Sequence, residues 1–96
     1  MAEVRLSPRA QNDLEGLFDD TVARWGLAQA MRYTDLIEAA CTALAAAPYQ
    51  APACDHISPG YRRRAVEQHM IYFRVLDDGI AVIRILHQRM DAPRQL

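Results

Sequence analysis

The sequence predicts an α+β fold in which an N-terminal helical hairpin packs on one face of a small antiparallel sheet, in the order β-α-α-β-β-β. Apolar residues recur at helical spacing through the first half, and from Tyr61 the hydrophobic period changes to two. A segment with Pro48, Pro52, Pro59 and Gly60 separates the halves. With 96 residues, 51% of them hydrophobic and 24% charged, we expect residues 1–96 to form one globular domain.

The first half begins with a short strand, Val4–Leu6, and then two helices. Ser7-Pro8 starts the first helix, because a serine hydroxyl caps free N–H groups and proline suits the first helical position. Gly26 can end this helix in a left-handed conformation, and Pro48 stops the second one. With Gly26 alone as the connection, the helices must fold back as a hairpin. The two apolar stripes are Ala10, Leu14, Leu17, Phe18 and Trp25, then Ala30, Tyr33, Ile37, Ala40 and Leu44.

The second half contains three strand candidates. They are Tyr61–Val66, His69–Leu76 and Ile80–His87. A three-residue turn at 77–79 would pair Phe73 with Ile83 and Ile71 with Ile85. Because a slip of one residue inverts every side chain, we expect this turn over the two-residue turn at 78–79, which mixes polar and apolar residues on both faces. The core face would then hold Ile71, Phe73, Val75, Ala81, Ile83 and Ile85, and the outer face Tyr72, Arg74, Val82 and Arg84. Periodicity places Phe18, Trp25, Phe73 and Ile85 in the core.

The net charge of −1 conceals an asymmetry between the halves. Residues 1–55 carry four arginines and eight acids, a net of −4, whereas residues 56–96 carry seven arginines and four acids, a net of +3. All eleven basic residues are arginine. Arginine suits planar, bidentate recognition of carboxylates and phosphates, so each half could face a different partner.

Several classes of protein find no support in the sequence. No apolar run approaches the roughly 20 residues that cross a bilayer, and the N-terminus lacks the apolar core of a signal peptide. We therefore expect a cytoplasmic protein that does not associate with a membrane. Cys41 and Cys54 are expected to be reduced, inert thiols. No phosphate loop, CxxC or HExxH occurs, and His56, His69 and His87 are scattered. We therefore expect no cofactor and no metal.

Two polar segments stand out in the basic half. Arg62, Arg63 and Arg64 enter a strand, where alternation sends the first and third to one face and the second to the other. The last strand ends in His87, Arg89 and Asp91. Taken alone, the first segment fits an exposed strand kept soluble by charge, and the second a structural terminus. Because arginine is enriched among interface hot spots, we expect the arginine-bearing sheet to supply a partner-binding face that engages acidic groups. Its predicted members are Arg62, Arg63, Arg64, Tyr72, Arg74, Arg84, His87 and Arg89.

An ordered set of motifs resembles the ParE family, which belongs to the RelE/ParE toxin superfamily of bacterial toxin–antitoxin modules. The motifs are Leu6-Ser7-Pro8-Arg9-Ala10, Asp13-Leu14, Arg24-Trp25-Gly26, Gly60-Tyr61-Arg62-Arg63, Tyr72-Phe73-Arg74-Val75 and the segment 83–91. They span about residues 4–91. The resemblance implies the fold given above, a ParD-like antitoxin whose C-terminal segment wraps the toxin in a hetero-oligomer, and DNA gyrase as the inhibited target. It thus implies a toxin that acts by protein–protein binding, with no catalytic residues.

The main alternative is a RelE-like ribosome-dependent mRNA endoribonuclease, which shares the fold. Such cleavage needs a proton acceptor, a donor and cations, and RelE-type enzymes are associated with lysines, arginines and a C-terminal tyrosine or histidine. This chain has no lysine and no tyrosine after His87, which leaves Arg62, Arg64, Arg84 and His87 as a reduced set. A third alternative, a nucleic-acid-binding domain, fits poorly with near-zero net charge and few aromatics, so we expect no direct sequence-specific binding of nucleic acid.

Overall fold

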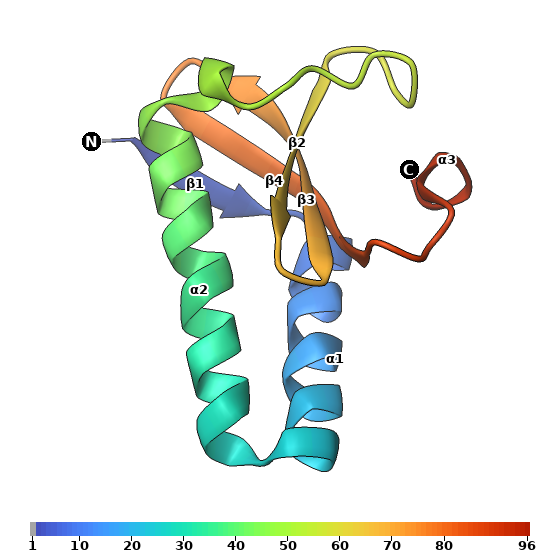
Figure 1. The fold of residues 1–96 in the computed structure, drawn as a ribbon. Helices are drawn as coiled ribbons and strands as arrows, with labels where there is room; N and C mark the ends of the chain where they lie inside the picture. Colours follow the sequence, from blue (N-terminus) through green and yellow to red (C-terminus); the bar gives the residue numbers. More distant parts are fainter. Residues whose placement is uncertain (1) are drawn as a thin grey trace.

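The computed structural model describes residues 2–96, so Met1 of the predicted domain lies outside the described residues. The elements are β1 (Glu3–Leu6), α1 (Pro8–Trp25), α2 (Leu27–Ala46), η1 (Pro48–Gln50), β2 (Tyr61–Val66), β3 (His69–Leu76), β4 (Gly79–His87) and α3 (Ala92–Gln95) (Figure 1). The predicted α+β class and the order β-α-α-β-β-β are confirmed. The 3-10 helix η1 and the short helix α3 are additions to the predicted order.

The helical hairpin forms where local signals place it. The Ser7 hydroxyl accepts a hydrogen bond from the Ala10 amide at 3.0 Å, and Pro8 occupies the first turn of α1. Gly26, with a φ of 92°, joins α1 directly to α2. The hairpin tip extends beyond the sheet (Figure 1), and Trp25 at that tip is 72% exposed. The predicted burial of Trp25 is therefore wrong, because the apolar stripe of α1 continues beyond the part of the helix that packs on the sheet. Phe18, also predicted to be in the core, is half-buried.

The sheet has the strand order β1-β4-β3-β2 and is mixed, not wholly antiparallel. Strands β2, β3 and β4 form an antiparallel meander, whereas β1 pairs with β4 in parallel. A parallel pair requires a long crossover, which the two helices and the later strands supply. Gly79 lies opposite Glu3, and a Cβ at Gly79 would collide with the Glu3 backbone. Glycine is thus needed where β1 joins the sheet.

The register of β3 and β4 differs from the prediction near the turn. The turn contains two residues, 77 and 78, so Leu76 faces Gly79 and Phe73 pairs with Val82. A β-bulge then absorbs one residue of β4, and Ile71 pairs with Ile85. The predicted Ile71–Ile85 pair is confirmed and the Phe73–Ile83 pair is wrong.

The bulge also decides which residues of β4 are buried. Ile80 and Val82 face the helices and are fully buried, in place of the predicted Ala81 and Ile83, which are half-buried. Without the bulge, a single register could not bury both Val82 and Ile85 on the helix side, because they are an odd number of residues apart. The β-bulge is therefore explained by the burial of Val82 and Ile85 on the same face of the sheet.

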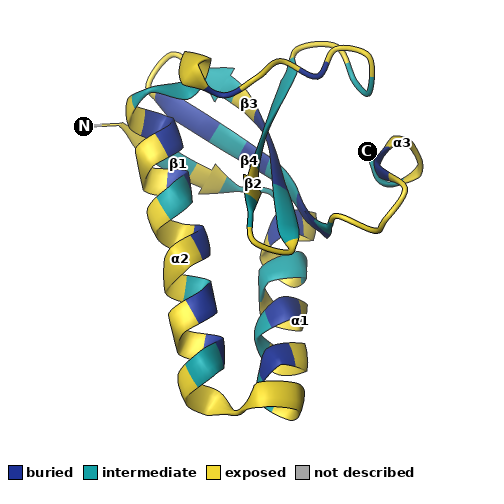
Figure 2. Cartoon of the chain, viewed as in Figure 1, coloured by how far each residue is buried: buried dark blue, intermediate teal, exposed yellow. Residues whose placement is uncertain are grey.

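Apolar residues fill both sides of the sheet. The main core lies between the helices and the sheet and includes Leu17, Ile37, Leu44, Ile71, Phe73, Ile80, Val82 and Ile85 (Figure 2). The opposite side carries a smaller cluster of Cys54, Tyr72, Leu86 and Ala92, with Ile57 and Leu96 packed against it. The loop after η1 and the C-terminal segment thus cover part of the face that the sequence predicts to be open.

The register predicts unequal costs for truncating two neighbouring residues of β4. Val82→Ala should lower the free energy of unfolding by about 2 kcal/mol, because it empties a fully buried position. Ile83→Ala removes more atoms but should cost about 1 kcal/mol, because Ile83 is half-buried. Urea unfolding of both variants measures the order, and a larger loss for Ile83→Ala would contradict the observed register.

Candidate partner-binding site

A groove of about 500 Å³ lies between α1 and the ends of β3 and β4. Its long wall is α1 from Asn12 to Trp25, and the start of α2 and the turn between β2 and β3 also line it. Leu17, Tyr33 and Ile85 supply buried apolar surface to its lining, and the exposed Met90 lies at the end of β4. The groove therefore combines apolar surface with charged side chains from α1, as expected of a surface that binds another protein.

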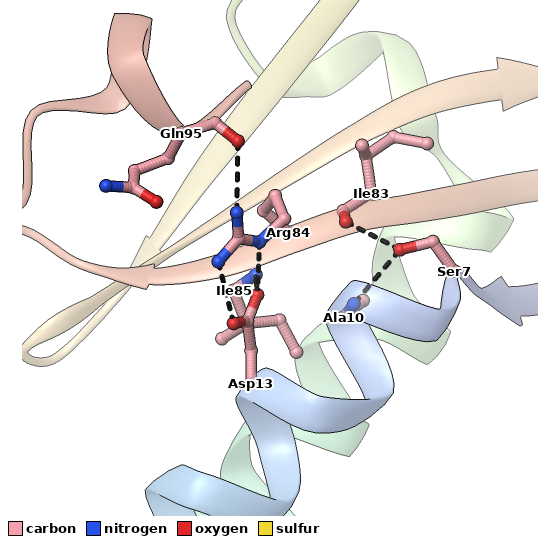
Figure 3. A network of polar contacts seen from close by, with 7 residues as sticks. All are labelled: Ser7, Ala10, Asp13, Ile83, Arg84, Ile85 and Gln95. Carbon is pink, nitrogen blue, oxygen red and sulfur yellow. Dashed lines mark hydrogen bonds and ion pairs between the residues drawn. The ribbon is translucent and has the colours of Figure 1, made fainter.

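The sheet edge beside this groove is capped by α1. Strand β1 ends at Leu6, opposite Val82, so the second half of β4 has no neighbouring strand on the β1 side, although β3 pairs with its other edge. The Ser7 hydroxyl donates to the Ile83 carbonyl at 2.6 Å, and the Asp13 carboxylate accepts from the Ile85 amide at 2.9 Å (Figure 3). These side chains take the place of a continued β1 and leave little of this edge of β4 for another chain to pair with.

Arg84, a predicted partner-binding residue, is an internal anchor in the same network. Its Nε and Nη2 donate to the two Asp13 carboxylate oxygens at 2.7 and 3.0 Å, and its Nη1 donates to the Gln95 carbonyl at 3.0 Å (Figure 3). The side chains of Arg84 and Asp13 are 12% and 16% exposed. This bidentate pair connects α1 to β4, and the bond to Gln95 adds α3, so Arg84 has an internal structural role.

Sequence reasoning missed a polar cluster of Tyr33, His69 and His87 in the groove. The Tyr33 hydroxyl lies 2.7 Å from His69 Nδ1, donates to the Val66 carbonyl at 3.2 Å and accepts from the Gln68 amide at 3.1 Å. All three contacts are satisfied when His69 carries a proton on Nδ1, because the carbonyl can only accept. The signal was present, since the predicted Ile71–Ile85 pairing also sets His69 opposite His87.

The two histidine rings pack edge to face, with centroids 5.3 Å apart. Burial lowers the pKa of His69 below its ordinary value of 6.5, and the neighbouring His87 lowers it further, whereas Asp13 opposes the shift. Burial also raises the pKa of the Tyr33 hydroxyl. The cluster is therefore neutral at pH 7 at both His69 and Tyr33, and it holds the β2–β3 turn against α2.

The remaining arginines divide between the two faces of the sheet. Arg62 and Arg64 pair with Phe73 and Ile71 and so lie on the helix side, whereas Arg63 pairs with Tyr72 and lies on the outer side. Arg62 donates to the Ala51 carbonyl at 2.6 Å and stacks over Tyr49, and Arg74 lies over the Tyr61 ring. Between residues 2 and 96, Arg62, Arg63, Arg64, Arg74 and Arg89 form no ion pair.

We define the arginine strand surface as Arg63, Arg64 and Arg74, the three arginines on β2 and β3 whose side chains make no hydrogen bond to the described chain, unlike Arg62. Tyr72, which the sequence placed on this face, is 4% exposed and belongs to the smaller cluster. It is covered because the loop and the C-terminal segment lie over it. The arginine strand surface thus has fewer members than predicted: Arg63 and Arg74 lie on the outer face of the sheet, and Arg64 lies on the helix side of the edge strand β2.

The structure does not bring together the four residues that the ribonuclease alternative requires, Arg62, Arg64, Arg84 and His87. His87 pairs with His69, whereas Arg62 pairs with Phe73, four residues or about 13 Å further along β3. Arg84 is held by Asp13. Arg62 and Arg84 therefore do not converge with His87 on one point where a phosphate could bind.

Residues 2–96 also show no reactive thiol, no metal-binding cluster and no membrane-spanning helix. Cys41 and Cys54 are buried free thiols, and burial raises the pKa of Cys41 to about 11 and raises that of Cys54. Residues 2–96 contain no cluster of three or more His, Cys, Asp or Glu side chains that could hold a metal ion. No helix in that range is long and apolar enough to span a membrane.

The Asp13–Arg84 pair predicts a large effect from one substitution. Asp13→Ala should lower the free energy of unfolding by about 3 kcal/mol, because it leaves a mostly buried guanidinium and the Ile85 amide unpaired. Asp19→Ala, an exposed acid on the same helix, should change it by less than about 0.5 kcal/mol. Adding Arg84→Met to Asp13→Ala should recover about 1 kcal/mol. Equal urea midpoints for Asp13→Ala and Asp19→Ala would refute this role.

The lowered pKa of His69 predicts acid sensitivity. The folded chain binds fewer protons at His69 than the unfolded chain does, so this contribution to stability is complete above about pH 6.5 and is lost as the pH falls through the lower, folded pKa. Urea unfolding at pH 7.5, 6.5 and 5.5 should show a steeper loss for the wild type than for His69→Gln. Parallel losses would show that His69 does not titrate in this way.

The chain matches known toxins over nearly its whole length. Residues 4–92 match the family described as ParE toxin of type II toxin-antitoxin system, parDE. Toxin ParE1 of Mycobacterium tuberculosis is 46% identical, covering 95% of this chain and 94% of that protein. Toxin ParE1 of Caulobacter vibrioides is 34% identical, covering 100% of this chain and 99% of that protein.

A solved structure supports the same fold. It is described as a chromosomal ParDE TA system from P. aeruginosa and superposes with a TM-score of 0.78, covering 91% of this chain and 96% of that chain. At 24% identity, this likeness shows the fold. From the family match and the two relatives, the chain belongs to the ParE toxin family of type II toxin–antitoxin systems.

Proposed function

We propose that this ParE-family chain is a toxin that acts by binding proteins: it inhibits DNA gyrase and is neutralised by a ParD-like antitoxin. The observation that carries the proposal is that one chain has both an open groove and a set of arginines without carboxylate partners. Its candidate catalytic residues, in contrast, do not converge. Relatives named as toxins over the same length support it.

The groove fits the antitoxin. Its apolar lining and the exposed Trp25 and Met90 offer contact area for the apolar face of an amphipathic helix. Residues 8–46, which form the hairpin, carry six acids and three arginines, a net of −3. The hairpin charge favours a helix with basic residues along its flank.

The arginine strand surface fits an acidic partner surface. Arg63, Arg64 and Arg74 project from neighbouring strands, and none of them has a carboxylate partner among residues 2–96. Arginine and tyrosine are enriched where binding energy is concentrated, and here Arg74 lies over the Tyr61 ring. We propose that this surface contacts acidic groups on gyrase or on the antitoxin; measuring both gyrase inhibition and antitoxin affinity for the Arg63→Ala, Arg74→Ala variant separates the two.

The function is tested with purified chain in two assays: supercoiling of plasmid DNA by gyrase, and cleavage of mRNA on translating ribosomes. We expect lost supercoiling, intact mRNA and restoration of supercoiling by the ParD-like antitoxin. Cleaved mRNA with gyrase unaffected would overturn the proposal and support the ribonuclease alternative.

The arginine strand surface predicts a defect in binding without a defect in folding. Arg63→Ala with Arg74→Ala should weaken gyrase inhibition or antitoxin binding about tenfold or more, with the melting temperature nearly unchanged. Arg9→Ala, an exposed arginine in the first turn of α1, is the matched control and should leave both activities intact. Wild-type potency and affinity in the double variant would exclude this surface.

A further inference from the structure

Gly16 occupies a position in α1 that nothing in the chain itself explains. It lies in the middle of the helix and lines the groove. Glycine inside a helix is unfavourable relative to alanine, because it loses more conformational freedom on folding. A Cβ built at Gly16 would meet no heavy atom within 4 Å, so an alanine would fit without any rearrangement.

The other three glycines each have a structural reason. Gly26 and Gly60 have φ values of 92° and 81°, in the left-handed region that other residues avoid. Gly79 lies against the Glu3 backbone. Gly16 has neither a positive φ nor a close neighbour. The open space at Gly16 therefore lies on the groove side of α1, where the described chain itself does not fill it.

The groove sets the kind of segment that can approach. Ser7 and Asp13 occupy the Ile83 carbonyl and the Ile85 amide, so a strand laid in the groove would find this edge of β4 already bonded. A segment buried there must satisfy its own backbone hydrogen bonds, as a helix does. The α1 wall from Asn12 to Trp25 is about 20 Å long, which accommodates three to four helical turns.

We propose that Gly16 is the point at which a helix of the ParD-like antitoxin crosses α1, and that its missing side chain selects the partner helix. Packed helix axes are about 8–10 Å apart, and the side chains at the contact set the distance. At Gly16 the partner backbone can approach closely, provided that the partner also has a small residue at the crossing. Flanking apolar residues then reach Leu17, and a basic residue meets the exposed Asp20 one turn away.

The proposal rests on the proposed antitoxin function and predicts opposite effects on stability and on binding. Gly16→Ala should raise the melting temperature by about 4 °C, because it removes an unfavourable helical glycine. The same change should weaken the binding of the ParD-like antitoxin about tenfold, and Gly16→Leu about 100-fold, because each added group pushes the helices apart.

The experiment is isothermal titration of the wild type, Gly16→Ala, Gly16→Leu and Ala39→Leu with the ParD-like antitoxin, with melting curves of each free chain. Ala39 is exposed on α2 outside the groove, so Ala39→Leu controls for added bulk and should bind as the wild type does. Unchanged affinity in both Gly16 variants, with a wild type that binds, would overturn the Gly16 proposal and leave the proposed function standing. A wild type that fails to bind would overturn both. A lower melting temperature for Gly16→Ala would show that the chain itself requires the glycine.

Discussion

The carboxylate of Asp13 joins the two layers of this protein. Strand β1 is only four residues long, so half of β4 would have an open edge without another partner. Asp13 accepts from the Ile85 amide and from two nitrogens of Arg84, and the Ser7 hydroxyl bonds the Ile83 carbonyl nearby (Figure 3). These bonds hold α1 against the end of β4, and Asp13 itself lines the groove that runs along the helix. One wall of the groove is thus tied to the sheet by a mostly buried ion pair.

The acidic first half and the basic second half of the sequence place their charges on different parts of the fold. Six of the eight acids of the first half lie on the helical hairpin, whereas four of the seven arginines of the second half lie on β2 and β3. The two sets belong to different layers of the fold (Figure 1). Such a molecule can present one surface to a basic helix and another to acidic groups, which is the property expected of a toxin that has both a target and an antitoxin.

Elements set by local chemistry could be predicted from the sequence. The serine cap, the glycine between the helices and the proline after them define the hairpin without reference to the rest of the chain. The β-bulge could not be predicted, because it depends on burying Val82 and Ile85 on one face at once. Trp25 was misplaced because helical periodicity does not reveal where the sheet ends.

The candidate site was less predictable than the fold, for reasons that lie in tertiary contacts. Arg84 looks like any other strand arginine until Asp13, 71 residues away, is placed beside it. Tyr72 is covered by a loop and a C-terminal segment whose sequences carry no periodic signal. The Tyr33–His69–His87 cluster joins three elements, of which only the pairing of the two histidines follows from strand register.

The central claim is that the groove along α1 holds the antitoxin. Amide hydrogen exchange of this chain, free and bound to the ParD-like antitoxin, tests it most directly because it maps the contact without any substitution. Added protection should appear along α1 from Asn12 to Trp25 and at the end of β4. Protection confined to the loop after η1 and the C-terminal helix α3, with α1 exchanging as in the free chain, would contradict the account.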